Sequence, residues 1–469
     1  MPLKVVSSLA ILTVLLVPAA GAQLDSCAGT GRPGATLLFP YFGVNLDDAN
    51  AEKTLISIKN ESPDPKLAHV VLWSNCGLPV LAFDVYLERY ALRSIDLGNV
   101  VGLGLLPSWE PAVDDAGLSL GCKFPLAPLG GPALARLQAR LLGEPDPVDG
   151  LCYAEAAGKK RLATGYVTVD VVKSCSEGSL TPWDEGYFGD DESALASDEN
   201  VLWGDFYFVS DAESSAQGFE AVTLLAGDEV VADGRSFYGL GDRRQPLPDV
   251  HVTRFLNGGA FTGGTELLLW LDIPRGTEPG PCHGQCPSVR FLHFQDLPEA
   301  GGEPRTAAVR EISKVTQRLR VGMDIPVSTR GGSLKACNTS YQSWVLPIYS
   351  ASGRFSVGTN AMHLCRSDLP SAKPTEEVGR PILDLIASLE CEPKGFAPAE
   401  VWRYTYKGQV VYYIPVHDCC DRFSELYDES GEIVCYPDGG IGGGGNGQCP
   451  DFFTERSDET LIWRDSRSF

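Results

Sequence analysis

The chain has 469 residues, of which 61 are acidic and 38 are basic, so its formal net charge is −23. A surface this acidic repels phosphate groups, and we therefore expect no nucleic-acid partner. The 51 glycines, 33 prolines and 14 cysteines favour many short strands joined by turns.

The first 22 residues are typical of a secretory signal. Lys4 supplies a positive start, Leu9–Val17 forms an apolar core, and a small-residue cleavage site ends at Ala22. The apolar run is shorter than the roughly 20 residues that a membrane-spanning helix needs, and no second long run follows. We expect cleavage after Ala22 and a secreted, periplasmic or cell-envelope protein without an integral membrane segment.

Several segments before residue 365 have strand patterns. In Leu81–Glu88 apolar residues alternate with others, which indicates a strand with one buried and one wetter face. Leu67–Trp73 is apolar on both faces and suits a central strand. Similar runs follow at Tyr166–Val172, Phe206–Val209, Glu266–Ile273 and Val289–Phe294.

Two segments have helical periodicity. Pro132–Leu142 places leucines on one stripe, with a proline at its start and Gly143 after its end. Pro381–Leu389 has apolar residues at i, i+3, i+4 and i+7. Because strands outnumber these helices, we predict an all-β fold, sandwich-like in one or two units, with minor helix. A small disulfide-rich α+β module is predicted at the C-terminal end.

Changes in composition suggest where the domains begin and end. An N-terminal β-rich domain is predicted at 23–183, before a loop at 184–200 that carries seven acids and no base. A second β-rich region at 201–365 is followed by a polar linker at 366–380. The cysteine-rich module then covers 381–453, and a tail covers 454–469.

The cysteines form an even set, which in an exported chain indicates disulfides. Each bridge typically stabilises the fold by about 2–4 kcal/mol. The spacing leaves the pairing open. The candidates are Cys27, Cys76, Cys122, Cys152, Cys175, Cys282, Cys286, Cys337, Cys365, Cys391, Cys419, Cys420, Cys435 and Cys449.

Two of the cysteine motifs have alternative interpretations. Cys282 and Cys286, with His293 downstream, could hold zinc, but the C-x3-C spacing is loose and a disulfide is favoured. Cys419 and Cys420 are adjacent and flanked by aspartates, which disfavour a reactive thiolate. We expect two structural bridges there.

No motif in the chain assigns a catalytic residue. Gly117–Gly121 matches G-x-S-x-G, but the flanking residues do not predict the strand and helix of a nucleophile elbow. Gly440–Gly445 matches G-x-G-x-x-G, but Cys449 and Pro450 soon afterwards argue against the helix of a dinucleotide site. The histidines are scattered without a metal motif, and His69 and His251 are expected to be packed or hydrogen-bonded. No cofactor is predicted.

The glycine-rich loop offers one alternative to a protein without metal. Asp438, Asn446 and Asp451 lie in or beside this loop and could supply oxygen ligands to calcium. A calcium-dependent structural module is therefore one of the functions considered.

A predicted hairpin near residue 407 is rich in aromatic residues. Large rigid rings often anchor protein interfaces, so this hairpin is a candidate contact face, but packing of the rings inside the module's own core is the favoured interpretation. The five rings belong to Trp402, Tyr404, Tyr406, Tyr412 and Tyr413.

Two parts of the chain resemble known groups. The segments TLLFPYFGVNLDDAN (36–50), TLISIKNES (54–62), LAHVVLWSNCGLPVLAFDVYL (67–87) and HVTRFLNGGAFTGGTELLLWLD (251–272) resemble a group of uncharacterised exported bacterial proteins over roughly 30–365. Residues 381–453, with CCD, LYD, PDGG and CPDF elements, are similar to a small cysteine-rich bacterial secreted or lipoprotein domain of unknown function. These resemblances imply a bacterial envelope or extracellular protein and assign no chemistry.

The sequence therefore favours a non-enzymatic protein that acts through surface recognition or assembly, with a protein or glycan partner. The alternatives are a secreted glycan hydrolase with paired carboxylates and the calcium-dependent module.

Overall fold

A computed structural model describes most of the chain. The described residues are 27–107, 126–143, 161–176, 180–189, 194–212, 214–227, 236–239, 242–248, 250–272, 288–294, 305–311, 314–327, 329–337, 342–351, 355–364, 378–379, 381–382, 385–386, 389, 399–416, 422–440 and 442–465. No helix within these ranges is both long and apolar enough to cross a membrane.

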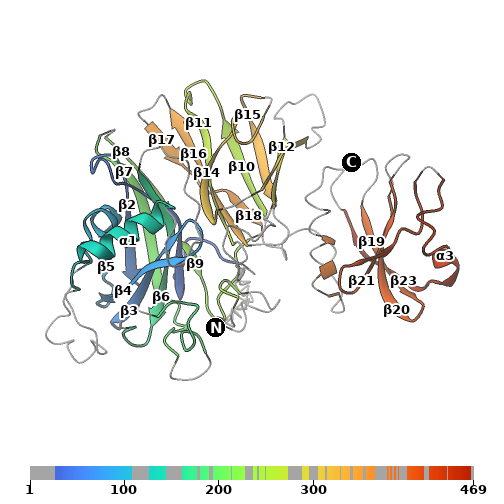
Figure 1. The fold of residues 1–469 in the computed structure, drawn as a ribbon, viewed down its shortest axis with the longest axis horizontal. Coiled ribbons are helices and arrows are strands. Elements are labelled where there is room, and N and C mark those ends of the chain that lie inside the picture. The colour runs from blue at the N-terminus through green and yellow to red at the C-terminus, as the bar shows by residue number, and fades with distance from the viewer. Residues whose placement is uncertain are drawn as a thin grey trace, which may run out of the picture.

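Two antiparallel sheets form the first sandwich (Figure 1). Sheet I has the order β4-β3-β6-β1-β9 and sheet II the order β5-β2-β7-β8. Sheet I contains β1 (Thr36–Asn45), β3 (Lys66–Ser74), β4 (Pro79–Leu87), β6 (Leu162–Val172) and β9 (Val222–Leu224). Sheet II contains β2 (Glu52–Asn60), β5 (Leu92–Asp96), β7 (Leu202–Ser210) and β8 (Ser215–Glu220). The π-helical turn η1 (Gly98–Gly102) and helix α1 (Gly131–Leu141) pack beside them.

Sheets I and II approach closely where β1 crosses β7. Phe39 packs edge-on against Phe206, with ring centroids 6.0 Å apart. A Cβ atom at Gly204 would lie 2.5 Å from the Ser57 carbonyl oxygen and 3.0 Å from Leu37. Only glycine fits at this crossing of the two sheets.

Two further sheets form the second sandwich. Sheet III has the order β14-β11-β16-β17 and sheet IV the order β13-β12-β15-β10-β18. Sheet III contains β11 (Gly264–Leu271), β14 (Thr316–Arg320), β16 (Ser343–Ala351) and β17 (Phe355–Gly358). Sheet IV contains β10 (Val250–Leu256), β12 (Ser288–Phe294), β13 (Arg305–Glu311), β15 (Gly331–Cys337) and β18 (Met362–Leu364).

Sheet III is buried on both faces, which joins the two sandwiches. Successive side chains of a strand point to opposite faces. On β11, Leu268 and Trp270 belong to the core shared with the first sandwich, whereas Leu267 and Leu269 belong to the core shared with sheet IV. The Trp270 ring meets Tyr166 of β6 with centroids 5.7 Å apart. The described strands between residues 36 and 364 therefore form a continuous stack of sheets.

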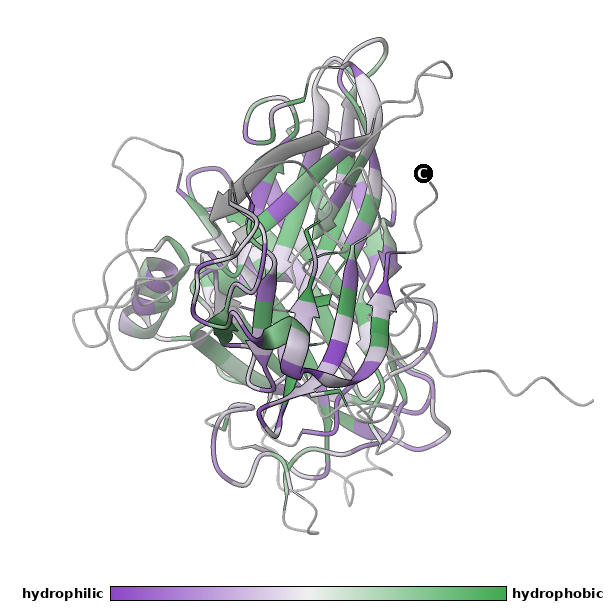
Figure 2. Cartoon of the chain, turned by 90° about the vertical axis from the view of Figure 1, so that its right-hand side faces the viewer, coloured by the Kyte–Doolittle hydropathy of each residue, from purple (hydrophilic) through white to green (hydrophobic). Residues whose placement is uncertain are grey.

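The C-terminal module is built on sheet V, with the order β22-β21-β20-β19-β23. Figure 1 shows it apart from the other sheets, and Figure 2 shows hydrophobic and hydrophilic residues in turn along several strands. Its elements are β19 (Glu400–Tyr406), β20 (Gln409–Ile414), β21 (Glu425–Asp428), β22 (Ile433–Cys435), α3 (Phe452–Glu455) and β23 (Ser457–Arg464). Lys407 and Gly408 turn the first hairpin with φ of 51° and 79°, as a tight hairpin requires.

The all-β prediction is confirmed, and each predicted strand overlaps a strand of the structure. Helix α1 confirms the predicted helix near residue 132. Of the second predicted helix, positions 381, 382, 385, 386 and 389 are described and helical. Ile382 and Ile386 are buried in the module, on the face that the periodicity indicates.

The predicted wetter face of Leu81–Glu88 differs from the structure. Asp84 and Tyr86 are both buried, because a later segment covers this face of sheet I. Tyr187, Leu195 and Ala196 pack there in a small apolar cluster with Tyr86.

Strands on both sides of residues 184–200 belong to the same sheets. β7 follows this acidic segment and pairs with β2 along nine residues, and β9 pairs with β1. The predicted loop at 184–200 thus lies within the stretch of chain that forms the first sandwich.

Candidate functional site

A row of buried polar residues crosses sheet I. Thr36, Asp170, His69 and Asp84 stand opposite one another on the neighbouring strands β1, β6, β3 and β4. Because directly paired residues share a face of a sheet, their side chains lie on one side. All four side chains are buried.

Asp170 is the centre of one half of this row. Its carboxylate accepts hydrogen bonds from the hydroxyls of Tyr187 and Tyr238, each at 2.9 Å, and from Thr36. Arg244 donates to Thr36 at 2.9 Å and lies 4.0 Å from Asp170. Burial, and then the charge of Asp170, raise the pKa of both tyrosines, so both hydroxyls stay protonated as donors.

Asp84 is the centre of the other half. It lies 2.6 Å from Nδ1 of His69 and accepts hydrogen bonds from the backbone N–H and hydroxyl of Ser176. The other ring nitrogen of His69 lies 2.9 Å from the carbonyl oxygen of Leu180. His69 therefore connects Asp84 of β4 with the backbone at Leu180. The row thus fastens the covering segment to sheet I and leaves little room for a ligand.

A second polar cluster joins sheets III and IV. Nε2 of His251 lies 2.8 Å from the Ser343 hydroxyl, and its Nδ1 lies 2.7 Å from Nδ1 of His363. The His363 ring stacks on Trp344, with centroids 3.7 Å apart. Burial lowers the pKa of His363 to about 4, and burial with the second ring lowers the pKa of His251 well below its usual value.

This arrangement resembles a nucleophile with a base and an orienting group, but it is closed. Ser343 and His251 are each only 1% exposed, so a substrate could not reach the hydroxyl. A catalytic serine must lie beside a space for the reacting atom. We interpret the cluster as a structural joint between sheets III and IV.

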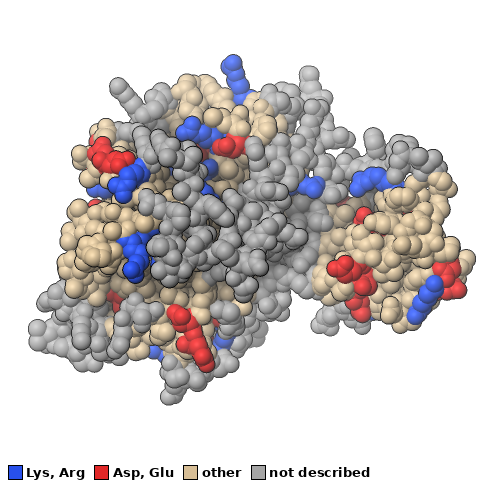
Figure 3. All heavy atoms as spheres, in the orientation of Figure 1, with Lys and Arg blue, Asp and Glu red and all other residues tan. Residues whose placement is uncertain are grey.

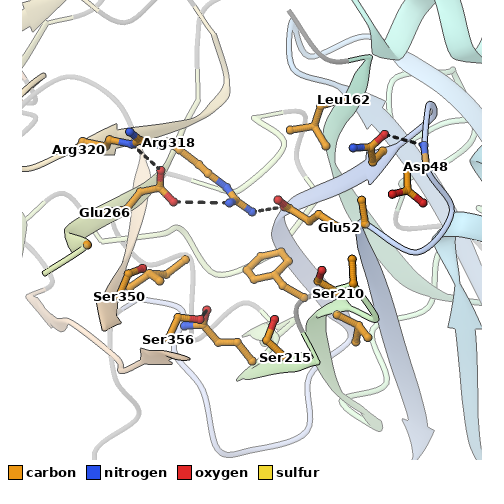
Figure 4. Close-up of a pocket in the computed structure, with 18 residues that line it drawn as sticks. Asp48, Glu52, Leu162, Ser210, Ser215, Glu266, Arg318, Arg320, Ser350 and Ser356 are labelled. Carbon is orange, nitrogen blue, oxygen red and sulfur yellow. Dashed lines mark hydrogen bonds and ion pairs between the residues drawn. The ribbon is translucent and has the colours of Figure 1, made fainter. Parts of the chain in front are cut away.

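An open groove of about 700 Å³ lies between sheets II and III (Figure 4). Its volume falls within the range of about 300–1,000 Å³ that is typical of ligand sites. One wall comes from β2, β7 and β8, and the other from β11, β14, β16 and β17. This groove is the candidate functional site.

Arg318 spans the groove between two glutamates. Figure 4 shows it extending from β14 toward Glu52 of β2, with which it forms an ion pair. It also lies 3.5 Å from Glu266 of β11, and Arg320 lies 3.9 Å from the same carboxylate. These four charged side chains are therefore paired with one another, while a fifth, Asp48, also lines the groove and accepts a hydrogen bond from the backbone N–H of Asn50.

Aromatic rings hold Arg318 from behind. Its guanidinium carbon lies 4.6 Å from the ring centre of Tyr41 and 5.2 Å from that of Phe208. Burial alone would lower the pKa of Arg318, but Tyr41, Glu52 and Glu266 together raise it, so the side chain stays charged. Burial raises the pKa of Tyr41 as well, so its hydroxyl stays neutral.

A bulge in β1 positions this part of the site. The pairing of β1 with β6 shifts between Phe39 and Phe42. Pro40, which cannot donate a backbone hydrogen bond, lies at the shift, and its carbonyl accepts from the Thr316 hydroxyl at 2.7 Å. The next residue, Tyr41, packs against Arg318 two residues after Thr316 on β14.

Two hairpins carry the neutral polar groups of the groove. Ser210 pairs with Ser215 in the β7–β8 hairpin, and Ser350 pairs with Ser356 in the β16–β17 hairpin. The hairpins meet where Ser356 donates to the amide oxygen of Gln217 at 3.1 Å. These hydroxyls and amides can both donate and accept hydrogen bonds.

The aromatic residues predicted as a contact face lie mainly inside the module. The rings of Tyr404, Tyr406, Tyr412 and Tyr413 are buried, and only Trp402 is half-buried. Tyr404 and Tyr406 pack edge-on against Phe452 of α3. The structure therefore places these rings in the module's core, the interpretation that the sequence favours.

The candidate calcium ligands each have other partners. Asp451 accepts from Tyr406 and forms an ion pair with Lys407 at 2.8 Å. Asp438 accepts from Tyr413 at 2.9 Å, and Asn446 accepts from nearby backbone N–H groups. Across the described part of the chain, no three His, Cys, Asp or Glu side chains gather as a metal site.

Five of the candidate cysteines are disulfide-bonded. Cys435 is bonded to Cys449, with a Cα–Cα distance of 6.3 Å. Cys27, Cys76 and Cys175 are also in disulfides.

Of the other nine candidate cysteines, one lies within the described residues and eight lie outside them. Cys337 is buried at the end of β15. The cysteines that lie outside the described residues are Cys122, Cys152, Cys282, Cys286, Cys365, Cys391, Cys419 and Cys420. The signal-like residues 1–22, the Gly117–Gly121 motif and most of the predicted linker at 366–380 also lie outside the described residues.

The charged groups of the groove were not found from the sequence. Glu52 and Arg318 are 266 positions apart, and neither lies in a recognisable motif. Each is a charged residue in a segment that otherwise has a strand pattern. This feature is too common in sequences to identify a site. Among the described residues on the face drawn in Figure 3, acidic and basic side chains are interspersed and form no large patch of one charge.

Comparison with known proteins adds a family match for the module alone. A model of a domain of unknown function, DUF6970, matches residues 387–465. No curated protein matches the chain. The match covers β19–β23 and α3 and leaves out the groove.

Proposed function

We propose that this chain is an exported recognition protein, stabilised by disulfides, whose ligand binds in the groove between sheets II and III. The observation that carries the proposal is an open, mainly polar groove in which Arg318 is held between Glu52 and Glu266. Such a lining provides hydrogen bonds for binding without exposing a reactive group. The ligand is a glycan or a protein segment.

Export is supported by two independent features. The first 22 residues have the pattern of a secretory signal, and the disulfides suit an oxidising compartment outside the cytoplasm. In this proposal, residues 381–453 form a separate small module, and a linker at 366–380 joins it to the stack of sheets.

Glycan hydrolysis is a second candidate, because Glu52 and Glu266 face the same groove. A glycosidase needs one carboxyl group that keeps a proton for the leaving group. Both glutamates instead form ion pairs with Arg318, so neither carboxyl group is free to face a leaving group. This pairing favours recognition over hydrolysis.

The binding site can be tested by filling the groove. Ser215 lines it, whereas the next residue, Ala216, is exposed and points to the other face of β8. We expect Ser215→Trp to abolish binding and Ala216→Trp to retain it. Thermal-shift screening of both variants and wild type against oligosaccharides and peptides measures this.

Two other outcomes of the screen would point away from recognition in the groove. A ligand that stabilises all three proteins equally binds elsewhere, and the proposal then fails. Release of reducing sugar that is lost in Glu52→Gln would instead support hydrolysis.

A further inference from the structure

The matched charges of the groove restrict the kind of ligand it can take. Arg318 is held by Glu52 and Glu266, and Arg320 lies near Glu266. An anionic ligand would have to compete with two carboxylates for Arg318, and a cationic ligand that binds Glu52 or Glu266 would have to displace Arg318. Separating a partly buried ion pair is costly because each charge loses its partner. An uncharged ligand avoids this cost.

The hydrogen-bonding groups of the groove suit a ligand with many hydroxyls. The side-chain hydroxyls of Ser215 and Ser350 make no hydrogen bond to any other described residue. Ser215 and Ser350 thus offer hydrogen-bond donors and acceptors on both walls.

Apolar side chains between the polar ones complete the lining. Leu162, Phe208 and Ile348 all face the groove. A sugar ring presents C–H groups on its faces and hydroxyls around its edge, so it matches apolar surface below and serines at the sides. A lipid chain would leave the hydroxyls of Ser215 and Ser350 without partners. A peptide could not easily add a strand here, because the edge strands β8 and β17 pack on each other, with Gly358 against Phe219.

We propose, building on the proposed function of the groove, that its ligand is an uncharged carbohydrate chain that forms hydrogen bonds with the two opposed serine pairs. Ser210 and Ser215 contact one side of the chain, and Ser350 and Ser356 contact the other. Arg318 keeps the walls at a fixed separation through its glutamate partners and makes no ion pair with the ligand.

Affinity electrophoresis tests this with the whole secreted protein, whose acidic charge drives it through a native gel. Gels contain a neutral polysaccharide (mannan, dextran, xyloglucan or hydroxyethylcellulose) or an acidic one (polygalacturonate or alginate). We expect retardation by at least one neutral polymer, loss of it in Ser215→Trp and no change in Ala216→Trp. Ser350→Ala should weaken binding about fivefold, as expected for one lost hydrogen bond.

Salt provides a second readout. Binding without an ion pair should be nearly unchanged in isothermal titration with a neutral oligosaccharide between 0.05 and about 0.5 M salt, where screening becomes strong. Equal melting temperatures of the variants show that each one folds.

The possible failures can be told apart. Groove-dependent binding only to acidic polymers or to peptides overturns the carbohydrate assignment and leaves the recognition site in place. If no probe shows a difference between Ser215→Trp and Ala216→Trp, both proposals are wrong.

Discussion

The stack of sheets I–IV and the C-terminal module keep their strands together in different ways. In the stack, β11 and β16 bury apolar side chains on both faces, and their cores adjoin those of the neighbouring sheets. In the module, two small clusters lie on sheet V, and the Cys435–Cys449 bond closes the segment between β22 and α3. Cys27, Cys76 and Cys175 of the stack are disulfide-bonded as well, so the two regions differ in the size of their cores, and the smaller core should depend more on its covalent link.

The comparison predicts that the stack is most sensitive to loss of an apolar side chain in sheet III. Trp270 is buried and stacks on Phe237 with centroids 5.6 Å apart. We expect Trp270→Ala to lower the free energy of unfolding by about 3–5 kcal/mol, because it removes a large ring and leaves a cavity. Urea unfolding measures the loss.

Leu256→Ala is the matched control in the same region. Leu256 lies on β10 and is 40% exposed, so its truncation should change stability by less than about 0.5 kcal/mol. Similar losses in the two variants would contradict the view that sheet III joins the two sandwiches through its core.

The module should depend instead on its disulfide. The bond joins residues 14 positions apart, and closing a loop of this size typically stabilises a fold by about 3 kcal/mol. We expect the double variant Cys435→Ser/Cys449→Ser to speed hydrogen exchange in β20 and β21. Exchange in β1 and β6 serves as the internal control, and an equal increase there would show that the two regions unfold together.

Local patterns predicted many strands and the helix α1, because the side-chain period is a property of a short segment. The alternation in β4 and the Lys407–Gly408 turn needed no distant residue. By contrast, the burial of Asp84 depends on a covering segment about 90 residues later, with Ser176 as its hydrogen-bond donor. Nothing in the strand's own sequence indicates that contact.

The site and the sheet order were harder to predict for the same reason. Glu52 and Arg318 meet only because sheet II packs against sheet III. β7 pairs with β2 across the acidic segment, and charge composition says nothing about strand pairing. The division of the chain into independently folding domains stays a prediction. The aromatic rings of the module illustrate a further limit, since alternation gives the same pattern for a core face and for an interface.

The stability of the stack and that of the module should also depend differently on pH, and this effect is smaller. The His251–His363 pair lies in the stack, whereas the module has one histidine, His417, which lies outside the described residues. Burial lowers the pKa of His363 from 6.5 to about 4. Below pH 6.5 the unfolded chain therefore takes up a proton that the folded protein resists. The stabilisation that the folded protein gains from neutral His363 is complete above pH 6.5 and is lost as the pH falls toward 4.

We expect this loss to reach about 2 kcal/mol, after allowance for partial exposure of the ring. Thermal unfolding at pH 7, 5.5 and 4.5 measures it for wild type and His363→Phe, which retains a ring to stack on Trp344. The variant removes one titrating group, so its stability should fall less steeply with acid, although its stability at pH 7 is lower because His251 loses a partner. Carboxyl groups titrate alike in wild type and in His363→Phe, so their contribution cancels when the stability of one is subtracted from that of the other. Parallel curves would mean that the pair does not carry the acid sensitivity of the stack, and its contribution would then be that of any buried contact between sheets III and IV.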